Sequence, residues 1–210
     1  MDPRLGDDVR YLPGVGARRA GLLRKLGVET VHDLLHHLPR RHEDRRSFRP
    51  IAALGEGDTA ILRGKVVSIR SQRIRGRRSY VTARVADDSG EVEVRWWNQP
   101  WIARNLPPGT ELVLSGKVRD GRISAAEYEV LRDDPALHVG RIVPVYPLTK
   151  GLSGPGLRRT IAGALERTAA QLPDPLPEDI RARHDLPALD RALRDVHLPP
   201  DYPALGRALK

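Results

Sequence analysis

Apolar positions recur with a helical period in the first 40 residues. Residues 11–27 start with a Pro-Gly-Val-Gly turn and place Ala20, Leu22, Leu23 and Leu26 on one side of a helix that Gly27 ends. A second helix is expected over residues 30–38, because Thr30 can cap its first turn, with Asp33 three residues on, and Pro39 cannot continue it. The pattern therefore predicts a short helical hairpin at the start of the chain.

From residue 59 the apolar period changes to two, which is typical of strands with one buried face. Gly, Pro and Asp-rich turns divide this region, and we expect five strands at residues 59–69, 80–85, 91–97, 111–118 and 122–130. Residues 70–78 read as a hairpin loop, and residues 100–106 as one or two helical turns between the third and fourth strands. Five short strands with a helical insert at that place predict an OB-fold, a small Greek-key barrel.

The pattern changes again after residue 138. Residues 143–148 are expected to be extended because two prolines interrupt them, and residues 153–170 and 186–196 carry helical patterns separated by proline-rich stretches. We expect a helical connector with little room for a core of its own. The predicted class is α+β, divided into a helical region (1–50), an OB-fold (51–138) and a connector (139–210).

The charge is strongly segregated. The 210 residues carry a formal charge of +9, and residues 1–80, with 18 Lys and Arg against 9 Asp and Glu, hold the whole surplus. GC-rich coding explains the preference for Arg over Lys but not the surplus, which favours an anionic partner such as nucleic acid. The densest cluster lies in the expected hairpin loop: Arg70, Arg73, Arg75, Arg77 and Arg78. A solvated turn is the alternative, but loops of OB-folds often contact nucleic acid.

Other classes of protein are disfavoured. The chain has no cysteine, no long apolar run and no signal-peptide pattern, so we expect a cytoplasmic monomer without disulfides. His32 and His36 lie one helical turn apart, but no third ligand follows at a recognisable spacing. We expect no metal site, and no catalytic residues, since no nucleophile is paired with a base and a third supporting group.

All three tryptophans lie within six residues, at positions 96, 97 and 101. In the strand 91–97 the valines share a face with Trp96, which predicts Trp96 in the core and Trp97 on the polar face beside Arg95. Trp97 and Trp101 would then form a surface on which bases stack, with Arg95 contacting the phosphate backbone. The alternative is that both rings pack beneath the insert as a small satellite core.

The turn before the first helix offers a second candidate contact. A Gly-x-Gly turn ahead of a helix resembles half of a helix-hairpin-helix, in which backbone N–H groups approach a DNA phosphate. Gly14 and Gly16 would allow that approach, and Arg18 and Arg19 would add charge. An ordinary capped hairpin explains the same residues.

These motifs together resemble a known family, the bacterial RecG-type branched-DNA helicases, over their N-terminal part. The resemblance rests on five segments in order: Leu12-Pro-Gly-Val-Gly, Leu34-Leu-His-His-Leu-Pro-Arg-Arg-His-Glu-Asp44, Trp96-Trp-Asn-Gln-Pro-Trp101, Pro144-Val-Tyr-Pro-Leu-Thr-Lys-Gly-Leu-Ser153 with Leu157-Arg158, and Ala192-Leu-Arg-Asp-Val-His-Leu-Pro199. It implies an OB-fold wedge that splits strands at stalled forks and Holliday junctions during recombination and repair. In the family, two aromatic residues stack on bases at the branch point, and these correspond to Trp97 and Trp101, where Phe or Tyr is usual.

The resemblance also implies helicase motor domains, which these 210 residues do not contain. Neither Gly-Lys pair, at Lys65 and Lys117, fits the phosphate-binding pattern G-x-x-x-x-G-K-[ST]. We therefore expect no ATPase or helicase activity and no cofactor in this chain, because ATP and Mg²⁺ would belong to the motors. The chain is expected to be part of a larger protein or half of a split gene, acting on branched or single-stranded DNA near the nucleoid. The alternatives are an independent single-strand-binding OB protein and an adaptor that docks a separately encoded motor.

Overall fold

The computed structural model describes residues 3–74, 78–131 and 137–210, and it divides the chain into two compact units. One unit is formed by residues 47–135, and the other by residues 1–46 together with 136–210. Three consecutive regions were expected. The structure instead joins the N-terminal region and the connector, with boundaries after residues 46 and 135 rather than after 50 and 138.

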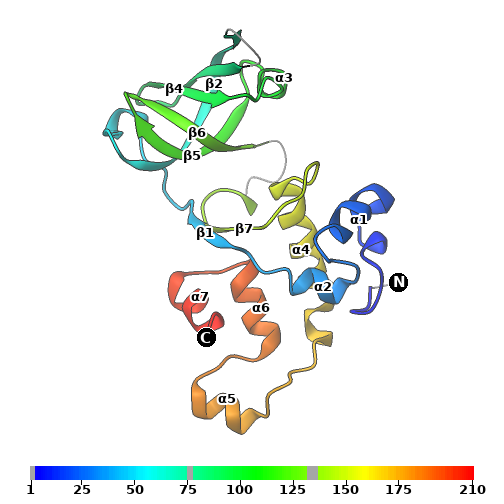
Figure 1. Ribbon diagram of the computed structural model, residues 1–210. Helices are drawn as coiled ribbons and strands as arrows, with labels where there is room; N and C mark the ends of the chain where they lie inside the picture. Colours follow the sequence, from blue (N-terminus) through cyan, green and yellow to red (C-terminus); the bar gives the residue numbers. More distant parts are fainter. Residues whose placement is uncertain (1–2, 75–77, 132–136) are drawn as a thin grey trace. The chain divides into compact units, whose positions relative to one another are not determined.

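The unit of residues 47–135 is a closed five-stranded barrel, as the alternation predicted (Figure 1). Its strands are β2 (Thr59–Arg73), β3 (Ser79–Ala86), β4 (Glu91–Trp97), β5 (Glu111–Arg119) and β6 (Arg122–Val130), preceded by a 3-10 turn, η2 (Ile51–Ala53). The strand order is β2-β3-β4-β6-β5, and a parallel pairing of β4 with β6 closes the barrel. This is the OB-fold expected from the sequence.

The barrel core is filled from every strand and sealed by the helical insert. The helix α3 (Ile102–Asn105) lies between β4 and β5, and its Ile102 and the following Leu106 are fully buried in the same cluster as Trp96. Strand β2 is longer than expected, because residues 70–73 pair with residues 79–82 of β3. Arg70 and Arg73 are therefore strand residues rather than loop residues.

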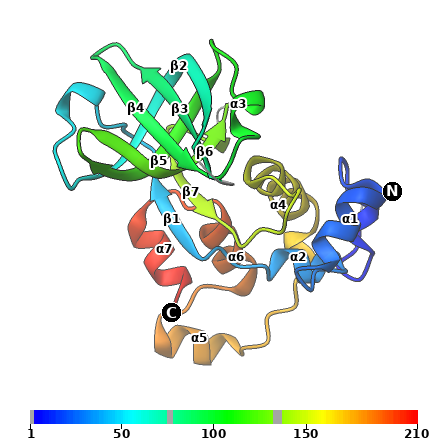
Figure 2. The same cartoon turned by 45° about the horizontal axis from the view of Figure 1, so that its top comes forward.

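In the other unit, helices from both ends of the chain share one core (Figure 2). Its elements are η1 (Val9–Tyr11), α1 (Gly16–Arg24), α2 (Val31–Leu35), β1 (Arg41–Asp44), β7 (Ile142–Val145), α4 (Gly154–Thr168), η4 (Ala169–Gln171), α5 (Glu178–His184), α6 (Leu189–His197) and α7 (Tyr202–Ala208). Leu23 of α1 and Leu35 of α2 belong to one cluster with Leu157 and Leu165 of α4 and Leu193 of α6. The connector thus buries its apolar faces against the N-terminal helices, in a core that the two regions share.

Local signals placed the start of α2 correctly but not its end. Thr30 caps α2, and the carboxylate of Asp33 accepts a hydrogen bond from the Thr30 backbone N–H, which completes a capping box. This hydrogen bond is the largest of the contributions that hold the pKa of Asp33 below its usual value. Helix α2 ends at Leu35, about a turn before the expected Leu38, and the chain then leads to β1, which pairs antiparallel with β7.

Candidate nucleic-acid interface

Two adjacent tryptophans at the end of β4 lie on opposite faces of the barrel wall. Trp96 is 1% exposed and belongs to the barrel core, whereas Trp97 is 48% exposed on the outer face. The register of β3 agrees, since buried Val81 pairs with Trp96 and half-buried Tyr80 pairs with Trp97. Strand alternation predicted this division from the sequence.

A short turn carries the chain from Trp97 to Trp101. Asn98 has a φ of 56°, in the left-handed region, where Asn is one of the few side chains that fit readily. Its N–H donates to the carbonyl of Ser79, and its side-chain oxygen accepts from the Ser79 N–H at 3.1 Å. Trp101 then precedes the first turn of α3 and is 51% exposed, while Ile102 beside it is buried. The structure places both rings outside the core, not in a satellite core.

Around Trp97 the outer face carries a cluster of rings and charges, in which the Tyr80 ring joins the Arg95 that the sequence already placed beside Trp97. The Tyr80 ring centroid lies 5.5 Å from that of Trp97, with the planes tilted by 52°. The guanidinium of Arg95 lies over both rings, 4.9 Å from the Tyr80 centroid and 6.0 Å from that of Trp97. Arg95 also donates to Glu93 at 2.9 Å.

The basic hairpin formed by β2 and β3 begins beside this cluster. Arg70 pairs with Thr82, which in turn pairs with Arg95 of β4, so these three side chains share one row of the outer face. Arg70, Arg73 and Arg78 are exposed, and the N–H of Ile74 donates to the carbonyl of Arg78. Arg75 and Arg77 lie outside the described residues. Arg70, Arg73 and Arg78 can therefore reach an anionic ligand from solvent.

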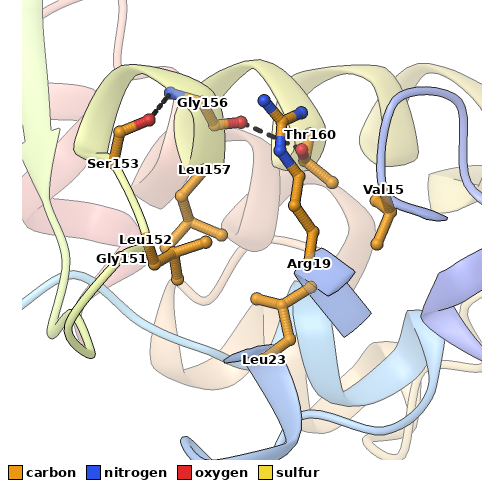
Figure 3. A pocket seen from close by; sticks show the side chains of 9 residues that line it. All are labelled: Val15, Arg19, Leu23, Gly151, Leu152, Ser153, Gly156, Leu157 and Thr160. Atoms are coloured by element: carbon orange, nitrogen blue, oxygen red, sulfur yellow. Dashed lines mark hydrogen bonds between the residues drawn. The ribbon is translucent and has the colours of Figure 1, made fainter. Parts of the chain in front are cut away.

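The second candidate contact lies in the other unit, at the start of α1. Gly14 and Gly16 both have positive φ, 76° and 56°, which explains why glycine occupies these positions in the turn. Arg18 and Arg19 are exposed, and Arg19 donates to the carbonyl of Gly14 at 2.5 Å. Figure 3 shows that Arg19 extends from α1 towards Thr160 of α4 and lines a small pocket there.

The buried charges of this unit have structural partners. Glu43 is 5% exposed. Burial raises its pKa, but hydrogen bonds and positive charge from Arg45 and Arg41 lower it further, so that it stays below its usual value. His197 is also buried, and its ring nitrogens contact the Leu35 carbonyl at 2.8 Å and the Tyr146 hydroxyl at 2.8 Å. Because a carbonyl only accepts, Nε2 of His197 carries the proton and Nδ1 accepts from Tyr146.

Residues 3–74, 78–131 and 137–210 hold neither a metal site nor a membrane span. No group of three or more His, Asp or Glu side chains in this part of the chain is arranged to hold a metal ion. No helix there is both long and apolar enough to cross a bilayer.

Tyr80 is the member of the cluster that sequence reasoning missed, whereas alternation along residues 91–97 already places Glu93 on the face of Arg95 and Trp97. Tyr80 was assigned to a strand, and alternation along β3 would place it on the outer face with Thr82 and Arg84. Its position next to Trp97 depends on the register between β3 and β4, which no local pattern reveals.

The sequence matches a known family model and several known proteins. The model described as "RecG wedge domain" matches residues 8–167. The protein "ATP-dependent DNA helicase RecG" of Thermotoga maritima is 30% identical, over 97% of this chain and 27% of that protein. The protein of the same name from Escherichia coli K12 is 33% identical, over 95% of this chain and 30% of that protein. The chain thus spans less than a third of these curated relatives.

A solved structure agrees with the sequence matches. "Structure of RecG bound to three-way DNA junction" superposes with a TM-score of 0.67 at 30% identity. The match covers 97% of this chain and 28% of the other, so both units have counterparts in it.

Proposed function

The chain belongs to the RecG wedge domain family, and from that premise we propose that it is the DNA-binding wedge of a RecG-type helicase. It recognises branched DNA, such as stalled forks and Holliday junctions, and separates strands at the branch point during recombination and repair. Motor domains bind ATP and Mg²⁺ and move the DNA, and this chain supplies no catalytic residue. It acts in the cytoplasm on chromosomal DNA, as a monomer attached to its motors.

The observation that carries this proposal is the pair of half-exposed tryptophans. Trp97 and Trp101 expose 48% and 51% of their surface on neighbouring elements of one barrel. An indole left half in water is unfavourable unless a partner covers it, and a nucleobase offers a flat apolar face of matching size. Each ring is proposed to stack on an unpaired base at the branch point.

Phosphate contacts are proposed for the exposed arginines of the basic hairpin. Arg70, Arg73 and Arg78 lie on or next to the strands that bear the aromatic cluster, and Arg75 and Arg77 belong to the same proposal. In the other unit, the backbone at Gly14 and Gly16 and the side chains of Arg18 and Arg19 are proposed to contact a duplex backbone. Such contacts add affinity without reading sequence.

Binding measured on matched DNA substrates tests the proposal. Fluorescence anisotropy at one salt concentration compares a three-way junction, a linear duplex and a single strand of equal length. A wedge binds the junction more tightly than either other substrate. Equal affinity for the single strand and the junction would instead indicate an independent single-strand-binding OB protein. No DNA binding, with capture of helicase motor domains, would indicate an adaptor.

A control substitution shows whether binding depends on the exposed rings of the barrel or on any exposed aromatic ring. Tyr202 of α7 is 46% exposed and belongs to the other unit, where it lies against Arg46. Tyr202→Ala should leave junction affinity unchanged, whereas Trp101→Ala should reduce it.

A further inference from the structure

The outer face of the barrel places three side chains from three strands in one row. Tyr80 of β3 pairs with Trp97 on one side and with Gln72 of β2 on the other. Side chains that pair across neighbouring strands lie on the same face of a sheet. Arg95 lies in the adjacent row, two residues before Trp97 on the same strand. The ring of Trp97 is therefore surrounded by fixed neighbours on its strand side.

These neighbours are themselves held in place. The hydroxyl of Tyr80 donates to the side-chain oxygen of Gln72. Arg95 donates to Glu93 at 2.9 Å, and Glu93 also pairs with Arg122 of β6 at 3.3 Å. The chain of contacts runs from β2 to β6 across four strands of a closed barrel. Rotation of any one side chain would break contacts made by the others.

Arg95 is poorly placed to act mainly as a phosphate ligand. Its side chain is only 22% exposed and is already paired with Glu93. Its Nε is buried and has no hydrogen-bond partner among the described residues, so the guanidinium is held by Glu93 and by the faces of the two rings. Arg70 in the same row is exposed and remains available to a phosphate.

Trp101 differs from Trp97 in this respect. Within residues 3–74, 78–131 and 137–210, no aromatic ring or guanidinium contact involves Trp101. It follows the turn at Asn98 and precedes a helix of only four residues. The two exposed indoles thus differ: Trp97 is braced by a ring and a guanidinium, and Trp101 has neither among the described residues.

We propose that Tyr80 and Arg95 are positioning residues that fix the ring of Trp97 before DNA arrives, so that Trp97 is the preformed stacking surface for one unpaired base. A ring held in its bound orientation loses less side-chain freedom on binding, and affinity rises by that saving. Trp101 adapts to its base and gains nothing from Tyr80. The inference rests on the proposed function, because it assumes that Trp97 stacks on DNA.

A double-mutant cycle on the full chain tests the coupling. Affinity for a three-way junction is measured for Tyr80→Ala, Trp97→Ala and the double variant, and for Tyr80→Ala combined with Trp101→Ala. From the usual energy of an aromatic pair, we expect Tyr80→Ala alone to weaken junction binding about 2- to 10-fold. In the Trp97→Ala background the same change should have no effect. In the Trp101→Ala background it should keep its full effect.

Conservative variants and a spectroscopic signal exclude a merely structural role. Tyr80→Phe keeps the ring and loses only the hydroxyl bond to Gln72, so it should retain most of the affinity and of the near-ultraviolet circular dichroism of the Tyr80–Trp97 pair. Tyr80→Leu keeps bulk without the aromatic ring and should lose both, while the chain stays folded with a cooperative unfolding transition. Arg95→Gln should weaken binding only when Trp97 is present. Arg84→Gln is the matched control, since Arg84 lies exposed on the same face, pairs with Glu91 at 3.1 Å and contacts neither ring.

The outcomes distinguish the stacking function from the positioning role. If Trp97→Ala leaves junction binding unchanged, the proposed stacking function fails. If Trp97→Ala weakens binding but folded Tyr80→Ala and Tyr80→Leu do not, the positioning role is overturned while the stacking function stands. A Tyr80→Ala effect that persists in the Trp97→Ala background overturns it as well, because Tyr80 would then contact DNA directly.

Discussion

Replacement by alanine should mainly affect fold stability at Trp96 and mainly affect DNA binding at Trp97. Trp96 is 1% exposed in the barrel core, so Trp96→Ala leaves a large cavity and should destabilise the fold by about 3–5 kcal/mol. Trp97 is 48% exposed and has only surface contacts, so Trp97→Ala should lower the free energy of unfolding by about 1–2 kcal/mol.

The effects on DNA binding should be reversed. Stacking contributes about 1–3 kcal/mol per base, so folded Trp97→Ala should bind a three-way junction about 5- to 150-fold more weakly. Trp96→Phe keeps a core ring and should bind like the unmodified chain as long as it is folded. Urea unfolding and fluorescence anisotropy, measured on the same preparations, give the two quantities separately.

Either of two results would refute this division between the two rings. Unfolding of the barrel by Trp97→Ala as readily as by Trp96→Ala would assign Trp97 to the core. A folded Trp97→Ala chain whose affinity for the junction stays within twofold of the original would remove this ring from the interface.

Three further predictions concern the turn, the basic hairpin and the buried histidine. Asn98→Ala places an unsuited side chain at a φ of 56°, so it should destabilise the barrel by about 1 kcal/mol and weaken junction binding through misplacement of Trp101. Asn98→Gly suits this φ and should keep the fold. Equal unfolding curves for the two variants would contradict this. The hairpin variants are Arg70→Ala, Arg73→Ala and Arg78→Ala. Each should reduce the slope of log affinity against log salt by about 0.9 for each phosphate that is no longer neutralised. An unchanged slope would remove the hairpin from the interface. Burial lowers the pKa of His197 to about 4, against the pull of its bond to the Leu35 carbonyl. The unfolded chain therefore binds the extra proton first as pH falls, so the stability this group provides is complete above about pH 6.5 and declines towards pH 4 by about 3 kcal/mol. His197→Gln, which can donate to Leu35 and accept from Tyr146, should show a smaller loss in urea unfolding over that range, and an identical loss would assign the effect to other groups.

The barrel was predictable because its signals are local. Alternation along residues 91–97 identifies the core face without any knowledge of the partner strands, and the turn residues locate the ends of each strand. The same alternation separated Trp96 from Trp97. The length of β2 was underestimated most, since the pairing of residues 70–73 depends on β3 rather than on an apolar pattern of their own.

Which segments of the chain make up the second unit could not be predicted from local sequence patterns. Strand β1 has the sequence Arg-His-Glu-Asp, with no apolar residue, and its partner β7 lies about a hundred positions further along the chain. Its stability depends on ion pairs such as Arg45 with Glu43 at 2.7 Å and on long-range hydrogen bonds such as His42 with the Val196 carbonyl. These contacts unite two regions that are separate in the sequence.

The barrel can expose two tryptophans because its core does not depend on them. Trp96, Ile102 and Leu106 are 1% exposed or less and seal the interior, so the outer positions at 97 and 101 are relieved of any packing role. One of these positions lies on a strand of a closed barrel and is braced by Tyr80, and the other follows a left-handed turn with no bracing ring among the described residues. A branch point presents two strands that leave in different directions. If Trp97 and Trp101 stack on DNA as proposed, a braced ring joined by three residues to an unbraced ring holds both strands without requiring the branch to match a single rigid shape.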